Sequence, residues 1–229
     1  MPNIFYKILF LILAYLLGSI PTGFLIGKSK GIDIRKHGSN NIGATNTARL
    51  LGKKYFLLVL FLDGLKGFIF VFLFRYGFLP HEWCLLSPIV YGIASTLGHV
   101  FPIFLKFKGG KAVATGAGIA LGYSPNICLV GIIAFTIVHL ITKFVSLGSL
   151  IAASSILITS IVVSLVNNQL TSNLFDMPTS RLWPINLWYV IGVLIIVSII
   201  FIKHKANIKR LANNEESKFE LIEEKNKKS

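Results

Sequence analysis

The sequence is poor in charged residues and in cysteine. Only 14% of its 229 residues are charged and 54% are hydrophobic, whereas about 25% of the residues in a typical soluble domain are charged. This scarcity of charge argues against a soluble globular protein. The two cysteines, Cys84 and Cys128, match no metal-ligand spacing and lie in or beside apolar runs, so the sequence predicts neither a disulfide nor a zinc site.

Long apolar runs recur along the chain. Several approach the ~20 residues that a helix needs to cross a bilayer, and they occupy residues 4–26, 55–74, 84–105, 126–142, 147–166 and 187–202. The runs are continuous rather than alternating, which argues against a membrane β-barrel. The first run lacks the basic segment and the cleavage site of a signal peptide, so we expect it to be retained. The predicted fold class is all-α, in a polytopic integral membrane protein.

Basic residues are concentrated in a few places. The net charge of +14 could indicate nucleic-acid binding, but an excess of lysine and arginine on the cytoplasmic side of a membrane protein explains it without a nucleic-acid partner. Most of the basic residues lie in four places: 28–54, 106–111, Lys143 and the end of the chain from Lys203. If all four are cytoplasmic, the N-terminus is outside, the C-terminus is cytoplasmic and the number of crossings is odd.

This charge distribution predicts about seven transmembrane helices. Between Lys111 and Lys143 the chain must cross the membrane twice. A short helix at 112–121, a turn at 122–125 and a helix at 126–142 would achieve this.

The chain shows no internal repeat and no long linker. We expect residues 1–211 to form a single helical membrane domain. Residues 212–229 are expected to form a charged cytoplasmic tail, frayed or disordered, because they are rich in charge and poor in apolar side chains. The outside loop at about 167–184 shows no obvious chemistry.

Two charged residues lie inside the second apolar run. Asp63 and Lys66 share one helix face, and charged groups within a span usually pair or mark a functional site. Gly64 and Gly67 beside them favour close contact between helices. We therefore expect a structural pair, in which Asp63 orients Lys66 or Arg49.

His99 lies three residues before Pro102, where a helix would kink or end. A lone histidine in a membrane helix more often hydrogen-bonds to a neighbouring helix. Its nearness to a basic segment nevertheless makes His99 a candidate functional residue. His139 has no such neighbours, and we expect it to serve packing.

The segment FKGGKAVATG, residues 107–116, has lysines on both sides of a glycine pair. It is not a nucleotide-binding P-loop, because Leu105 stands where the first glycine is required and Ala112 where a hydroxyl residue is required. A glycine pair that opens a helix near Lys111 still suits an anion, since free backbone amides, the helix N-terminus and two ammonium groups would converge there. The segment therefore predicts a phosphate-binding site.

Two further polar segments each allow two interpretations. Residues 38–47 are rich in residues that favour turns and caps, and they form either an ordinary membrane loop or an anion site completed by the Arg49 guanidinium. After the last run, His204 and Asn207 share one face of a helix that we expect to continue from the membrane. The lysines around them could instead simply contact anionic lipid.

Taken in order, six segments closely resemble the bacterial acyl-phosphate-dependent glycerol-3-phosphate acyltransferases. They are GSIPTGFLIGK (18–28), DIRKHGSNNIGATNTARLLGKK (33–54), LDGLKG (62–67), GHVFPIFLKFKGGKAVATGAG (98–118), KFVSLGSLIAA (143–153) and HKANIKRL (204–211). The likeness covers most of the chain apart from the extreme tail and the outer loop. It implies a seven-helix integral enzyme of the bacterial cytoplasmic (inner) membrane, with its active site at the cytoplasmic face.

The resemblance also implies the reaction and its participants. A fatty acyl group would pass from acyl-phosphate to the 1-hydroxyl of sn-glycerol 3-phosphate, giving lysophosphatidic acid and phosphate in the first step of phospholipid biosynthesis. No cofactor or metal is expected, and neither acyl-CoA nor acyl-carrier protein would be used directly. The partners are the two substrates and membrane lipid, with a functional link to the enzyme that forms acyl-phosphate.

Carried over residue by residue, the family's polar site falls on a defined set of positions. Ser39 and His99 are the expected catalytic residues. The expected substrate-binding residues are Asn41, Thr45, Asn46, Arg49, Lys108, Gly109, Gly110, Lys111, Ser146, His204 and Asn207. The chain departs from the family in two places. Asn40 replaces a glycine and tolerates the left-handed conformation. Ala112 replaces another, which is harmless if Ala112 is already helical but would strain the loop if a positive φ is required there.

The resemblance leaves the proton acceptor open. His99, hydrogen-bonded to Ser39, could take the hydroxyl proton, or a phosphate oxygen of a substrate could take it. An acyl group carried by Ser39 is a third route, although no acid that would orient a catalytic triad is evident. Arg49, Lys108 and the glycine amides are expected to hold one phosphate, and His204 and Asn207 to contact the other substrate.

Two other classes of protein fit less well. A transporter of anions or lipid phosphates often shows inverted repeats and a site at the membrane midplane, whereas the polar residues here gather towards one face. A non-catalytic scaffold would not explain why His99, Lys108 and Arg49 converge.

Overall fold

The computed structural model describes residues 2–166 and 183–219, and within these ranges every regular element is a helix. The all-α prediction is confirmed. The outside loop expected at 167–184 lies outside the described residues except for its last two positions, as does the final part of the tail from residue 220 onwards.

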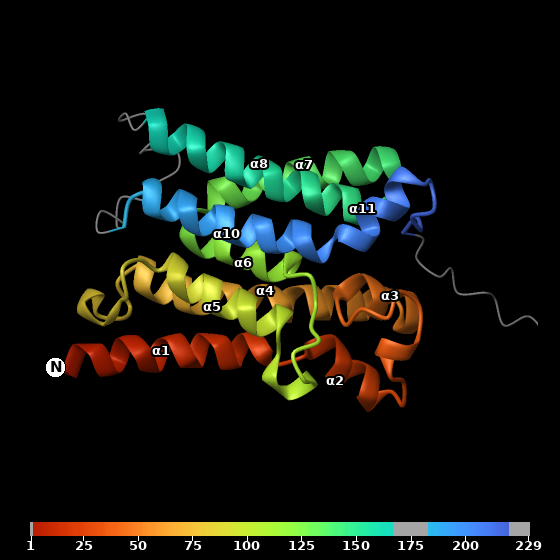
Figure 1. Ribbon diagram of the computed structural model, residues 1–229, viewed down its shortest axis with the longest axis horizontal. Coiled ribbons are helices and arrows are strands. Elements are labelled where there is room, and N and C mark those ends of the chain that lie inside the picture. Colours follow the sequence, from red (N-terminus) through yellow and green to blue (C-terminus); the bar gives the residue numbers. More distant parts are fainter. Residues whose placement is uncertain (1, 167–182, 220–229) are drawn as a thin grey trace, which may run out of the picture.

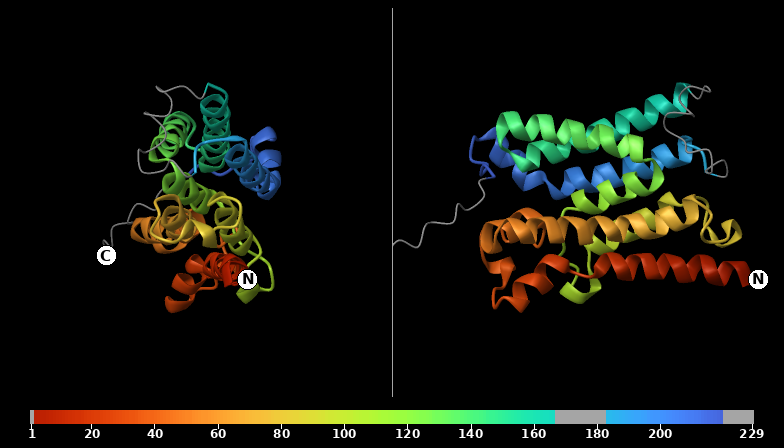
Figure 2. Two further views of the ribbon diagram at one scale, coloured as in Figure 1. Left: turned by 90° about the vertical axis from the view of Figure 1, so that its left-hand side faces the viewer. Right: turned by 180° about the vertical axis from the view of Figure 1, so that it is seen from behind.

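Within the described ranges, seven apolar helices form the bundle, and they run side by side along the long axis of the molecule (Figure 1). They are α1 (Pro2–Ser19), α4 (Lys53–Arg75), α5 (Ile89–Val100), α6 (Val113–Tyr123), α7 (Pro125–Thr142), α8 (Val145–Val166) and α10 (Leu187–Lys203). Seen end-on, α1 lies on one side of the bundle, α7, α8 and α10 lie on the other, and α4, α5 and α6 lie between them (Figure 2).

Three short helices gather at one end of the bundle (Figure 1). They are α2 (Thr22–Ser29), α3 (Ala44–Leu51) and α11 (Lys205–Ala212). Single turns of 3₁₀-helix complete the described elements: η1 (Ile34–Lys36), η2 (His81–Trp83) and η3 (Ile103–Leu105). The polar segments that the sequence singled out therefore lie mostly at the same end of the molecule.

The surface and the helix lengths suit a lipid environment. Large apolar side chains are exposed along the bundle, among them Phe61 at 65%, Ile141 at 77% and Leu165 at 79%. In the described part of the chain, three helices (α4, α7 and α8) are long and apolar enough to cross a membrane, or up to five if each of two bent helix pairs forms one span. The helices α5 and α6 are apolar but shorter.

Two of the expected helices are interrupted. The first apolar run divides into α1 and α2, which meet at an angle of 40°, because Pro21 has no amide hydrogen to continue the helix. The last run ends at Lys203, and the chain bends by 57° into α11 at His204. The expectation of one continuous helix through His204 and Asn207 is therefore wrong.

The region between Lys111 and Lys143 forms the two helices expected there, with bounds close to the expected ones. The short helix α6 is followed by a one-residue break at Ser124 and then by α7. The Ser124 side chain caps α7 by accepting a hydrogen bond from the Ile127 amide at 3.4 Å, and Pro125 occupies the first turn, where a missing amide hydrogen has no consequence. Likewise α5 ends at Val100, shortly before Pro102, as expected.

Close contact between α4 and α6 depends on glycine. A Cβ atom on Gly67 would collide with the carbonyl oxygen of Thr115, and one on Gly118 would collide with that of Gly64. In lipid, helices associate mainly through such close packing, because the surrounding solvent is itself apolar. The predicted close helix contact beside Asp63 and Lys66 is confirmed, and of the two glycines there it is Gly67 that the contact requires.

We predict that Gly67→Ala destabilises the protein by about 1–3 kcal/mol, because the added methyl group overpacks a backbone contact. The matched control is Gly64→Ala, one turn away on the same helix. Its Cβ would have only an ordinary contact, 3.6 Å from the Ala114 oxygen. Thermal unfolding in detergent should show a lower midpoint for Gly67→Ala alone, and equal midpoints would contradict the packing account.

Candidate functional site

Lys111 connects two segments that lie far apart in the sequence. It precedes α6, and its Nζ donates a hydrogen bond of 2.6 Å to Oδ1 of Asn207 in α11. Asn207 is buried, and the neighbouring His204, also buried, directs its Nδ1 to the Ile200 carbonyl at 2.8 Å. Because a carbonyl only accepts, that contact places the proton of a neutral His204 ring on Nδ1. Three of the predicted substrate-binding residues thus lie in one region.

The carboxylate of Glu216 lies at the centre of this region. Its Oε1 accepts hydrogen bonds from Ser146 Oγ at 2.8 Å and from Asn207 Nδ2 at 2.6 Å, and its Oε2 pairs with Arg210 Nε at 2.6 Å. The same segment is attached to the bundle by a hydrogen bond of 2.9 Å from the Phe219 amide to the Lys143 carbonyl. Within the described part of the tail, Glu216, Ser217 and Phe219 contact the bundle, whereas the sequence analysis expects a frayed or disordered segment.

The sequence analysis missed Glu216 and Arg210. Acidic pairs after a basic helix are common on surfaces, so the pattern alone does not distinguish Glu216 from the exposed Glu215 beside it. The distinction arises from the bend at His204, which turns α11 back towards α8 and brings Asn207 and Ser146 within reach of one carboxylate.

Burial determines the charge properties of the site. Burial lowers the pKa of Lys111 to about 8; the Glu216 carboxylate opposes this effect, while the positive charges of Arg210, Arg49 and Lys203 add to it. Burial also opposes ionisation of Glu216, but hydrogen bonds from Asn207, Ser146 and Arg210 prevail and lower the pKa of that carboxyl group. The result is a partly desolvated region with a concentration of positive charge.

Arg49 belongs to the same region. Its Nη2 donates a hydrogen bond of 3.3 Å to the Ser217 carbonyl, in the segment that carries Glu216. The ion pair of Asp63 is with Lys66, at 2.6 Å. Of the two alternatives for the partner of Asp63, the structure therefore supports Lys66, and the alternative with Arg49 is wrong.

The glycine pair packs against His99. The amide of Gly109 donates to the Val100 carbonyl at 3.1 Å, and that of Gly110 donates to the His99 carbonyl at 3.0 Å. A Cβ on Gly110 would collide with Nε2 of the His99 ring. The expectation of free amides at this pair is wrong, because both amides complete the end of α5; the glycines are needed for close approach to His99.

The residue after Lys111 has an unfavourable backbone conformation. Ala112 caps α6 with φ of 62° in the left-handed region, so of the two alternatives for this residue the structure supports the strained, positive-φ one. This conformation costs about 1–2 kcal/mol for a residue with a Cβ. Asn40, the other departure from the family pattern, also has a positive φ, 56°, which asparagine tolerates as expected.

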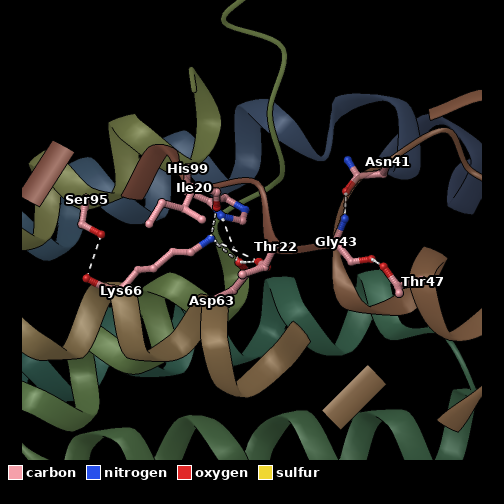
Figure 3. Close-up of polar contacts among 9 residues, drawn as sticks. All are labelled: Ile20, Thr22, Asn41, Gly43, Thr47, Asp63, Lys66, Ser95 and His99. Carbon is pink, nitrogen blue, oxygen red and sulfur yellow. Dashed lines mark hydrogen bonds and ion pairs between the residues drawn. The ribbon is translucent and has the colours of Figure 1, made fainter. Parts of the chain in front are cut away.

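Asn46 organises the loop before α3. Its buried side chain accepts from the Ser39 amide at 2.8 Å and donates to the carbonyls of Ile34, His37 and Asn41. Asn41 in turn accepts from the Gly43 amide at 2.9 Å (Figure 3). These two predicted substrate-binding residues thus use their side chains to hold the loop in shape.

The remaining predicted substrate-binding and catalytic residues are more exposed to solvent than Asn46. Ser39 is exposed, and among the described residues no hydrogen bond joins its hydroxyl to His99, so the alternative in which Ser39 hydrogen-bonds a proton-accepting His99 has no such contact to support it. Thr45 is half-buried near the start of α3, and Lys108 is exposed. His139 packs as expected, with its ring stacked on Phe135 at 5.7 Å between centroids.

An apolar groove of about 640 Å³ adjoins the site. It lies among α4, α6, α7, α8 and α10, and its lining includes Val113, two residues after Lys111, and Ile200 at the end of α10. Over the described ranges, no group of three or more histidine, cysteine or acidic residues is placed to hold a metal ion. The arrangement can bind an anion in a basic region beside a channel for an apolar chain.

We predict that Glu216→Ala lowers the unfolding temperature by about 5 °C, because it leaves Arg210 and Asn207 without their shared partner. Glu215→Ala is the matched control, since Glu215 is exposed. Thermal unfolding in detergent measures both. A loss of stability of the same size in the two variants would contradict a specific role for Glu216.

The chain is similar to known proteins over most of its length. The family described as glycerol-3-phosphate acyltransferase matches residues 8–214. A glycerol-3-phosphate acyltransferase of Bacillus subtilis is 41% identical over 215 residues, which cover 93% of this chain and 98% of that protein. One from Aquifex aeolicus is 39% identical over 214 residues, covering 93% and 100%.

Two solved structures of PlsY, an integral membrane glycerol 3-phosphate acyltransferase, are also similar. The glycerol 3-phosphate form superposes with a TM-score of 0.80 at 36% identity, over 93% of this chain and 96% of that one. The lysophosphatidic acid form gives a TM-score of 0.78 at 35% identity, over 95% and 97%. With the family match covering most of its length, the chain belongs to the glycerol-3-phosphate acyltransferase family.

Proposed function

We propose that the protein transfers a fatty acyl group from acyl-phosphate to the 1-hydroxyl of sn-glycerol 3-phosphate, which gives lysophosphatidic acid and phosphate. The observation that carries this proposal is the basic region around Lys111 at the end of an apolar groove. The solved relatives named for their glycerol 3-phosphate and lysophosphatidic acid forms support the acceptor and the product.

The two parts of the site match the two parts of the substrates. Lys111 and Arg49 supply positive charge for phosphate, and the exposed Lys108 lies three residues before Lys111 in the same loop. Ser146, Asn207 and His204 supply hydrogen-bonding groups at the same place. The acyl chain lies in the groove among α4, α6, α7, α8 and α10, so that only the reacting head group enters the polar region.

The chemistry requires little beyond positioning. Acyl-phosphate is a mixed anhydride and is already activated, so the acceptor hydroxyl oxygen bonds to the carbonyl carbon, the carbon–oxygen bond to phosphate breaks, and phosphate leaves. Alignment of two bound reactants can contribute roughly 7–11 kcal/mol of the barrier reduction. The basic side chains hold two anions together that would otherwise repel each other.

A substrate phosphate oxygen is the proton acceptor that the geometry favours. The His99 side chain is only 7% exposed, with Nδ1 3.8 Å from Asp63 and Nε2 packed against Gly110. A hydroxyl group cannot approach either ring nitrogen without displacing protein atoms. Ser39 is exposed and makes no hydrogen bond to His99 in the described part of the chain, so an acyl-serine route has little support.

We further propose seven crossings of the bacterial cytoplasmic membrane, with the N-terminus outside and the C-terminus in the cytoplasm. The short helices α2, α3 and α11 lie towards one end of the bundle (Figure 1), and basic residues are frequent in and beside these helices in the sequence, which suits a cytoplasmic active site. Acyl-phosphate is reactive, so an enzyme that forms it would act immediately upstream.

The test of the proposed function supplies the purified protein with palmitoyl-phosphate and glycerol 3-phosphate. We expect phosphate release and lysophosphatidic acid formation that depend on both substrates, and no product when palmitoyl-CoA replaces palmitoyl-phosphate. A Lys111→Met variant serves as the control for contaminating activity. Absence of product that depends on glycerol 3-phosphate would exclude the proposed reaction.

We predict that KM for glycerol 3-phosphate rises about tenfold between pH 7 and pH 9. Burial lowers the pKa of Lys111 to about 8, so the ammonium group loses its proton across this range while the substrate stays a dianion. The arginine of a Lys111→Arg variant keeps its charge, and its KM should stay nearly constant. An equal rise in both proteins would show that another group is responsible.

A further inference from the structure

A buried ion pair lies next to the candidate site. Asp63 and Lys66 in α4 are 2% and 4% exposed, and they pair at 2.6 Å. The same Asp63 oxygen accepts a hydrogen bond from the Thr22 hydroxyl and lies 3.8 Å from Nδ1 of His99 (Figure 3). Asp63 therefore contacts the first turn of α2 and faces the last turn of α5.

Lys66 holds Asp63 in this position. Its Nζ also donates to the Ile20 carbonyl, at the break between α1 and α2, and to the Thr22 hydroxyl at 3.2 Å. Its own carbonyl accepts from Ser95 Oγ in α5 at 2.9 Å (Figure 3). The ammonium group is thus occupied within the protein, and so it is not placed to bind substrate.

Asp63 favours one protonation state of the His99 ring. A carboxylate only accepts hydrogen bonds, so the nitrogen that faces it, Nδ1, is favoured as the protonated one. Nε2 then lies against Gly110 without a proton. The imidazole ring of His99 therefore lies between the Asp63 carboxylate of α4 and Gly110 of the loop.

His99 contacts the loop twice. Its carbonyl accepts the Gly110 amide at 3.0 Å, and its ring fills the space that a side chain at Gly110 would need. Lys111, which hydrogen-bonds Asn207 in the candidate site, is the next residue. A rotation of the His99 ring would therefore move the backbone that carries the Lys111 ammonium group.

We propose that Asp63 is a positioning residue, which acts through His99 to hold the loop of Gly109, Gly110 and Lys111 in its anion-binding geometry. The inference rests on the proposed function, in which Lys111 binds a substrate phosphate. A buried ion pair contributes little net stability compared with apolar side chains, whereas charged groups inside membrane helices commonly serve the site nearby. The pair is thus better explained by its contact with His99 than by stability alone.

The test replaces both charges at once. Asp63→Asn alone would leave Lys66 as an unpaired buried charge and could prevent folding. The double variant Asp63→Asn/Lys66→Gln keeps the net charge of the pair at zero and keeps hydrogen-bonding groups at both positions, while it removes the negative charge that faces His99. Gly64→Ala, between them in the sequence, is the matched control for a tolerated change in the same helix.

Two measurements are made on each protein: the unfolding temperature, and its increase on adding glycerol 3-phosphate, which reports affinity independently of turnover. We expect the double variant to unfold within a few degrees of the wild type but to bind glycerol 3-phosphate about tenfold more weakly, since small displacements of a binding group have large effects. KM should rise by the same factor while kcat changes less. Wild-type affinity in a folded double variant would overturn the proposal.

A second pair of variants covers the case in which the double variant does not fold. His99→Asn keeps a hydrogen-bond donor near Asp63, whereas His99→Leu has a similar volume and no donor. We expect the asparagine variant to retain more affinity for glycerol 3-phosphate than the leucine variant, and equal affinities would overturn the proposal. If wild-type protein binds glycerol 3-phosphate but forms no lysophosphatidic acid, the proposed reaction is wrong. The affinities of the variants for glycerol 3-phosphate still test the positioning role of Asp63 in that case.

Discussion

The structure depends on the need to satisfy charge inside a bundle of apolar helices. Water is excluded from such a bundle, so each charged group has to find its partners in the protein. Lys66 and Asp63 pair with each other in α4, and Lys66 also bonds to the break between α1 and α2 and to α5. Glu216 does so by joining α8 and α11 to the end of the chain. The helix ends that form the site are fixed by these two groups of contacts.

The sequence predicts the architecture because the signals for it are local or additive. Hydrophobicity over about 20 residues predicts the apolar helices, and the placement of lysine and arginine predicts the pair α6 and α7, which hydropathy alone would merge. Proline predicts the end of α5 at Val100. Gly64 and Gly67, beside charged residues, predict the close contact of α4 with α6.

The detail of the site is less accessible from sequence, since it depends on where helices bend and which atoms are already paired. The glycine pair predicts free amides at Gly109 and Gly110. The end of α5 lies against them, and its last carbonyls accept hydrogen bonds from both amides. The side-chain amide of Asn46 could bind a ligand, but it instead hydrogen-bonds backbone carbonyls and holds a loop in shape. Glu216 becomes significant only because the chain turns by 57° at His204.

The apolar groove also has an open side. Phe61 and Ile132 line it, yet they are 65% and 52% exposed on the lipid-facing surface of the bundle. A chain can therefore enter and leave the groove sideways, without passing through water. The rate of a reaction whose acyl donor enters from the bilayer depends on the fraction of donor among the surrounding lipids. Dilution with inert lipid should slow such a reaction even when the amount of donor per millilitre is unchanged.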